Sequence, residues 1–475
     1  MENTRIYKVL NHLSTPVLNR FIKFLKSPYH NVNANIETIA ALIIKQIKYK
    51  ENLPSKTDIW VKIFKDQEFD DLKFRKLCNE TLERFETFLT FEALDKDKLL
   101  KDNLLLQSLK EIQLEDLITK HISKSKRDIN RQFVQSSNFF LNKYLNDKIL
   151  QNLKSNYERK TDLKTYQKNS HVELLDSLDS FYTIERLRLA IDILTWEKMY
   201  KSPHKIDQKI QNQILEEANN SIHPTVQIYG KMYALNLDIT EKQNYYELKE
   251  MAFEHISSFP KDEQKEILDV LVSFCIKLCN KGEMDFFKET LAIYDWGIKE
   301  DIVFSQGRLS PTTFRNYVMS GLRVGEFDKI ENFITHHSKF LDENRRENAL
   351  NFNLGRVSFY RKEYQKVIQY LNLVNYDDIW YNINSKVLLF ASYYELDEID
   401  VLISSIEAFS TFLRREKDVQ NMRTQRYSNF SRYLKKIVNN KHRKDKIKKI
   451  NEALQADSGV VNKPWLLEKM GEILK

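Results

Sequence analysis

Glycine and proline are scarce in this chain. Its 475 residues contain 9 Gly and 8 Pro, and neither type occurs from residue 55 to residue 202. Tight turns need glycine for positive φ angles and proline for a preset φ, so folds that are rich in sheet and turns are excluded. Apolar residues instead recur mainly three or four positions apart, as at Leu82, Phe85 and Leu89. The sequence therefore predicts an all-α protein that is more than about two thirds helical and has no sheet.

Cysteines and long apolar runs are also few. The three cysteines are too few, and odd in number, for a disulfide framework, which indicates a reducing, cytoplasmic environment. An apolar run such as Ile39 to Ile44 ends at Lys45, far short of the roughly 20 residues that a membrane span requires. We therefore expect a cytoplasmic protein with no membrane partner.

The short motifs of common enzyme sites are absent. The sequence contains no HExxH, GxxxxGK[ST], GxSxG or GxGxxG. Cys275 and Cys279 lie four residues apart, but zinc needs four ligands and no second ligand pair follows. We expect Cys275 to pack in a core, and we expect a non-enzymatic protein without cofactor or metal.

The chain is too long for a single growing hydrophobic core, and its character changes along its length. Residues 1–220 predict an irregular helical region. The first glycine is Gly230, and beyond it the helices become shorter and paired. We expect helical repeats over residues 221–416 and basic helices over residues 417–475.

An internal repeat lies in the second half. The segment Ser358–Tyr364 aligns with Ser392–Glu398 at an offset of 34 residues, which is the period of tetratricopeptide repeats. Leu354-Gly355, Phe359 and Val367 occupy motif positions of that family. Residues 222–415 thus resemble a degenerate tetratricopeptide-like array, and the resemblance implies an α-solenoid. Its core would include Leu354, Phe359, Tyr364, Leu388 and Val401.

A polar turn precedes the first well-marked helix of these repeats. Ser310 is expected to cap a helix that starts with Pro311, while Arg308 in the turn could contact a ligand. The stretch Gly307–Asn316 also resembles a group of uncharacterised long all-helical bacterial proteins, and this likeness implies no activity.

The repeat resemblance also implies a binding groove. In tetratricopeptide proteins the first helix of each pair lines a concave groove that binds peptides. The positions that correspond to an exposed basic groove here are Arg315, Asn316, Asn353, Arg356 and Lys386. The aromatic residues that would lie among them are Phe352, Phe359 and Phe390. Such a groove favours an acidic peptide or a chain-terminal carboxylate. Only Asn353 matches the family's carboxylate clamp, so a chaperone-tail receptor is not expected.

Positive charge is concentrated near the C-terminus. From Arg414 to Lys449 the chain has 14 Lys or Arg and three acidic residues, while the rest of the chain is slightly acidic. A run of this kind is typical of a solvated helix face, but it also offers phosphate contacts. The candidate phosphate or nucleic-acid contacts are Arg432, Lys435, Lys436, Arg443 and Lys444.

Two functions follow from these patterns. The first is a scaffold or adaptor that binds a protein or peptide segment, preferably acidic, in the solenoid groove. The alternative is a nucleic-acid-associated protein that uses the basic C-terminal patch.

Overall fold

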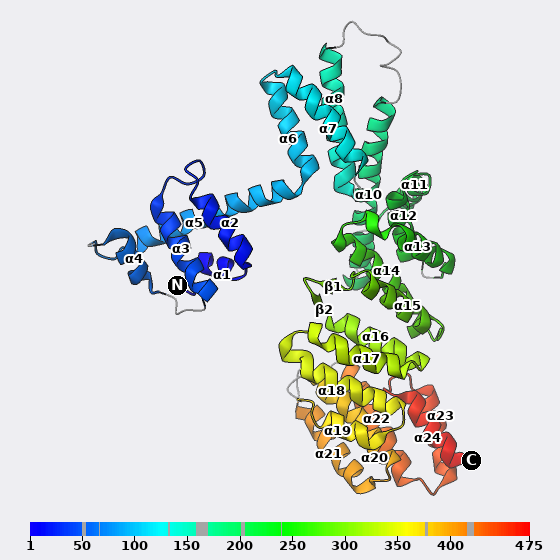
Figure 1. The fold of residues 1–475 in the computed structure, drawn as a ribbon. Coiled ribbons are helices and arrows are strands. Elements are labelled where there is room, and N and C mark those ends of the chain that lie inside the picture. The colour runs from blue at the N-terminus through cyan, green and yellow to red at the C-terminus, as the bar shows by residue number, and fades with distance from the viewer. Residues whose placement is uncertain are drawn as a thin grey trace. The chain divides into compact units, whose positions relative to one another are not determined.

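The chain folds almost entirely into helices. The structure is a computed structural model that describes residues 1–49, 54–65, 67–131, 134–157, 170–200, 205–238, 240–375, 379–415 and 422–475. About 80% of the chain is helical, which confirms the all-α prediction (Figure 1). The chain divides into two compact units, Met1–Arg186 and Leu187–Lys475. The boundary predicted at residue 220 stays a prediction, and the one at residue 416 lies outside the described residues.

The first unit is an irregular set of helices. They are α1 (Arg5–Asn11), α2 (Thr15–Leu25), α3 (Ala34–Tyr49), α4 (Lys56–Phe64), α5 (Asp71–Lys96), α6 (Lys98–Glu111), α7 (Glu115–Asn130), α8 (Ser137–Tyr157) and the first part of α10 (Ser170–Tyr200). Phe21 of α2 packs edge-on against Phe85 of α5, with ring centroids 5.1 Å apart, in a core that α1 to α5 share. Helix α6 packs against both α7 and α8.

The second unit continues with helices that contact their neighbours in chain order. They are α11 (Gln208–Asn219), α12 (Pro224–Leu237), α13 (Lys242–His255), α14 (Lys261–Asn280), α15 (Phe286–Lys299), α16 (Pro311–Val324), α17 (Phe327–His337), α18 (Glu343–Tyr360), α19 (Tyr364–Leu371), α20 (Ile379–Glu395), α21 (Ile399–Arg415), α22 (Met422–Asn439), α23 (Lys444–Ala456) and α24 (Lys463–Leu474). Short 3₁₀ turns, η1 (Ile256–Ser258) and η2 (Ser338–Phe340), follow α13 and α17. Some helices also contact the next but one in the chain: α12 contacts α14, α16 contacts α18, and α18 contacts α20.

None of the five positions predicted for the repeat core is fully buried. Leu354, Phe359, Tyr364 and Leu388 are partly buried between helices. Val401 is 46% exposed, so its assignment to the core was wrong. The next residue, Leu402, is fully buried instead, because α21 presents that face to its neighbours. Cys275 packs in the core as expected, and burial raises the pKa of its thiol to about 12.

A small hairpin corrects the expectation of no sheet. Strand β1 (Phe304–Ser305) pairs with β2 (Arg308–Leu309) in antiparallel register. The two residues of the connecting loop, Gln306 and Gly307, both have positive φ. This is the backbone geometry of tight two-residue turns between antiparallel strands. Ser310 then caps α16 as predicted, because its hydroxyl accepts a hydrogen bond from the Thr313 amide at 3.0 Å.

Candidate binding pocket

A pocket of about 700 Å³ lies in the second unit. Its walls come from α16, α18, the start of α19, α20, α22 and the turn that leads into α24. We call it the cationic pocket. Its charged and aromatic lining residues are Arg315, Arg323, Phe352, Arg356, Phe359, Tyr360, Lys362, Tyr364, Trp380, Glu395, Arg426, Tyr427, Lys463, Trp465 and Glu468.

Positive charge dominates this lining. Six side chains are cationic and two are carboxylates, Glu395 and Glu468. Glu395 is already neutralised, because its Oε1 accepts hydrogen bonds from Lys469 Nζ and from Trp465 Nε1, both at 2.9 Å. The charged side chains of the pocket lining therefore carry a net positive charge.

Arg356 lies deepest among the pocket's arginines. It is 9% exposed, and its Nη1 donates a hydrogen bond to Asn353 Oδ1 at 3.3 Å. Its guanidinium lies over the Phe352 ring, 5.8 Å from the centroid. Burial lowers the pKa of Arg356 to about 10, and the nearby charges of Arg323 and Arg315 act in the same direction. Among the described residues no carboxylate lies within 4.0 Å of it to balance this charge.

Arg315 and Arg323 lie eight residues apart on α16 and are both exposed. The Arg315 guanidinium lies over the Trp380 ring, 5.5 Å from its centroid, which is a cation–π geometry. Arg315 and Trp380 also line a second pocket of about 240 Å³, whose lining includes Asn353 and Arg345. The two pockets therefore share Arg315 and Trp380.

The predicted groove residues divide into three groups. Arg315 and Arg356 line the cationic pocket, and Asn353 lines the smaller one. Asn316 lines neither, because its Nδ2 donates to Tyr294 Oη of the preceding helix at 3.4 Å. Lys386 is half-buried on α20, also away from both pockets, and burial lowers its pKa.

Of these five positions only Arg315 is exposed; Asn316 and Lys386 are partly buried, and the expectation of exposure was wrong for Asn353 and Arg356, which are buried. Asn353 is 4% exposed and Arg356 is 9% exposed. Helix α18 has neighbours on several sides, since it packs against α16, α17, α19 and α20. Ala349 and Phe352 precede the pair at helical spacing and complete a buried stripe. Phe390, expected in the groove, is fully buried in the core around α20 to α24.

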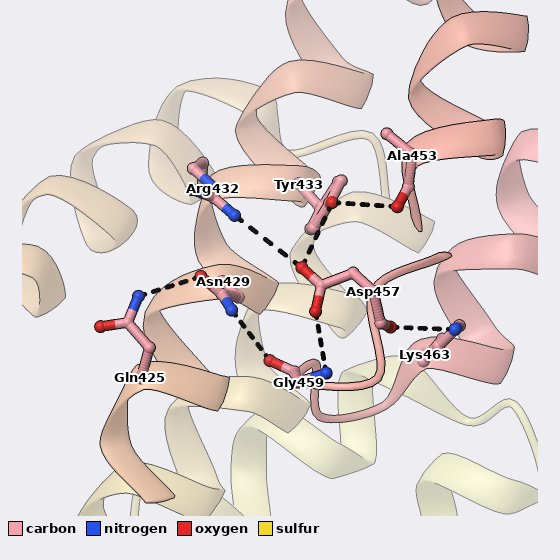
Figure 2. A network of polar contacts seen from close by, with 8 residues as sticks. All are labelled: Gln425, Asn429, Arg432, Tyr433, Ala453, Asp457, Gly459 and Lys463. Atoms are coloured by element: carbon pink, nitrogen blue, oxygen red, sulfur yellow. Dashed lines mark hydrogen bonds and ion pairs between the residues drawn. The ribbon is translucent and has the colours of Figure 1, made fainter. Parts of the chain in front are cut away.

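The C-terminal helices complete the cationic pocket. Tyr427 of α22 reaches α20, where its hydroxyl lies 3.0 Å from Asn384 Oδ1. The turn before α24 is held by a polar network around Asp457, shown in Figure 2. Asp457 Oδ1 accepts from the Gly459 amide at 2.8 Å, and Asn429 Nδ2 donates to the Gly459 carbonyl at 2.9 Å. Residues 460–464 are thereby fixed as one wall of the pocket.

Several of the predicted phosphate contacts are engaged within the protein. Arg432 lies 4.0 Å from Asp457 in the network of Figure 2. Lys435 pairs with Glu407 at 2.8 Å, and Lys436 lies over the Tyr433 ring. Arg443 and Lys444, at the start of α23, are exposed, and no carboxylate lies within 4.0 Å of them among the described residues. The basic segment is therefore partly neutralised.

Sequence reasoning missed several residues of the pocket. Arg323, Trp380, Arg426 and Lys463 come from four different elements, and no motif joins them. Arg426 belongs to the basic C-terminal segment, whereas none of the five predicted phosphate contacts lines the pocket. The concentration of basic residues is visible in the sequence. Which of these residues reach the pocket depends on how α22 packs.

Neither protein-family models nor curated protein sequences match this chain. Within the described residues, no group of three or more His, Cys, Asp or Glu side chains is arranged to hold a metal ion. None of the described helices combines the length and the apolar character that crossing a bilayer requires.

Proposed function

We propose that this chain is a non-enzymatic scaffold or adaptor that binds an acidic protein segment in the cationic pocket. The observation that carries the proposal is a cavity of about 700 Å³ with six cationic side chains and neutralised Glu395. Aromatic rings between the cations provide apolar contact for side chains of the bound segment.

The architecture that we propose for the second unit is a tetratricopeptide-like α-solenoid over residues 221–416. Contacts between successive and alternate helices support it, as does the 34-residue offset in the sequence. The C-terminal helices α22 to α24 then close one end of the groove. A closed end turns an extended groove into a pocket that can hold the end or a bend of a segment.

Affinity capture from the native cell tests the proposal. The tagged full chain is compared with an Arg315→Glu/Trp380→Ala variant and with Arg414→Glu, an exposed arginine of α21 outside the pocket. Proteins that co-purify with the wild type and with Arg414→Glu, but not with the pocket variant, support pocket binding. An identical set of proteins with all three baits would contradict it.

The alternative, nucleic-acid association, has one specific observation in its favour. Arg443, Lys444 and the neighbouring Lys446, Lys448 and Lys449 are all exposed on or beside α23. Nuclease treatment before capture separates the two functions. Partners that depend on RNA or DNA disappear, whereas partners bound in the pocket remain.

A further inference from the structure

The three arginines of the cationic pocket form a group that lacks a counter-charge. Arg315, Arg323 and Arg356 have no carboxylate within 4.0 Å among the described residues, and their mutual repulsion acts on Arg356. A buried charge without a partner destabilises a protein strongly, so such residues are usually paired. An anion in this pocket would remove that destabilisation.

Unused hydrogen-bond donors lie in the same place. A guanidinium carries five N–H donors, and Arg356 uses one of its groups on Asn353. Asn462, which also lines the pocket, has a buried Nδ2 with no acceptor among the described residues. The pocket therefore offers donors from α18 and from the turn before α24 to a ligand with several acceptor oxygens.

A phosphate monoester meets these requirements better than a carboxylate. It carries about −1.5 to −2 charges at neutral pH and three acceptor oxygens, whereas a carboxylate carries one charge and two oxygens. The planar guanidinium fork also matches phosphate geometry. Phe352 and Trp380, whose rings lie 5.2 Å apart edge to face, flank Arg356 and Arg315 and can receive the organic part of the ester.

We propose that the cationic pocket recognises a phosphorylated side chain of the bound protein segment, with Arg356 as the deep contact and Arg315 and Arg323 at the rim. This inference rests on the proposed function, because it names the group on the segment that the pocket binds. The cavity of about 700 Å³ is much larger than a phosphate and leaves room for the residues beside it.

Calorimetric titration of the full chain with small probes tests the inference. Phenyl phosphate is the main probe, and phenyl sulfate is its control of similar shape with one charge less. We expect saturable binding of phenyl phosphate, about tenfold or more tighter than that of phenyl sulfate or inorganic phosphate. Equal binding of the sulfate, equal binding of inorganic phosphate, or no saturable binding would overturn the proposal. Adenosine monophosphate that binds far more tightly than phenyl phosphate would indicate a free nucleotide instead of a segment.

Variants place the binding in the pocket. Arg356→Met removes the deep contact, and Arg315→Gln/Arg323→Gln removes two exposed ones with little risk to folding. Each should weaken phenyl phosphate binding about tenfold or more, while Arg414→Gln leaves it unchanged. Unchanged binding by the exposed double variant would contradict the site even if Arg356→Met fails to fold.

The two proposals can fail separately. If phenyl phosphate does not bind but partner capture still requires the pocket, only the phosphate assignment is wrong. If phenyl phosphate binds and capture is independent of the pocket, the adaptor function is wrong instead.

Discussion

The side chain of Glu395 holds helix α24 in place, and we predict that replacing Glu395 destabilises this helix measurably. Its Oε1 accepts hydrogen bonds from Lys469 Nζ and Trp465 Nε1, both at 2.9 Å, so α24 is held against α20. The Lys469 side chain is 7% exposed and the Glu395 side chain 15%. Burial alone would lower the pKa of Lys469, but hydrogen bonds to Glu395 and Glu472 outweigh it and raise the pKa.

The expected effect of Glu395→Ala follows from these contacts. Lys469 loses a charged hydrogen bond, and the Trp465 N–H loses its acceptor in a buried site, which together destabilise α24 by about 3 kcal/mol. Lys469 keeps Glu472, which limits the loss. Replacing both partners, as Glu395→Leu/Lys469→Met, should be much milder, because no buried charge is left unpaired.

Hydrogen–deuterium exchange of the full chain measures this locally. Amides of α24 should exchange roughly a hundredfold faster in Glu395→Ala, since about 1.4 kcal/mol corresponds to a tenfold change. Glu472→Ala is the control: its side chain is 54% exposed, and the loss should stay below about 1 kcal/mol. If both variants accelerate exchange equally, Glu395 does not hold the helix and the reasoning is refuted.

Three further outcomes are expected. Gly321→Ala should lower the stability of the second unit by about 1–3 kcal/mol in thermal unfolding, because a Cβ would lie 2.1 Å from Ile330 Cδ1; Gly471→Ala, with open space around it, should not. Burial raises the pKa of Glu263, so above about pH 4.5 the native state keeps a proton that the unfolded chain has released, and stability falls as pH rises. Glu263→Gln should therefore flatten the fall in melting temperature between pH 5 and pH 8, and an unchanged slope would show that Glu263 is not its source. If the basic segment binds nucleic acid, the logarithm of its affinity should fall with the logarithm of the salt concentration at a slope of roughly −0.9 per contacted phosphate. Replacing the five candidate residues with Glu should abolish this binding. Failure of the wild-type protein to retain DNA or RNA at about 50 mM salt would exclude this function. Those five positions are Arg432, Lys435, Lys436, Arg443 and Lys444.

Local patterns explain which predictions were correct. A shortage of glycine and proline leaves few conformations except helix, and Ser310 before Pro311 marks a helix start through a single side-chain hydrogen bond. These effects act within a few residues. The two-residue hairpin escaped prediction because the Gln306-Gly307 turn that forms it has no alternating strand pattern on either side.

The sequence by itself determined the helical class, the capped helix starts and the concentration of basic charge. Tertiary structure decided which of these residues meet. From the sequence alone, the polar side chains of Asn353 and Arg356 are expected to face solvent. Packing of α18 against several helices buries them instead. Arg426 reaches the pocket of Arg315 only because α22 and α24 fold against α20. Periodicity records which face of a helix is apolar, whereas the neighbour that covers the face depends on contacts between residues far apart in the chain.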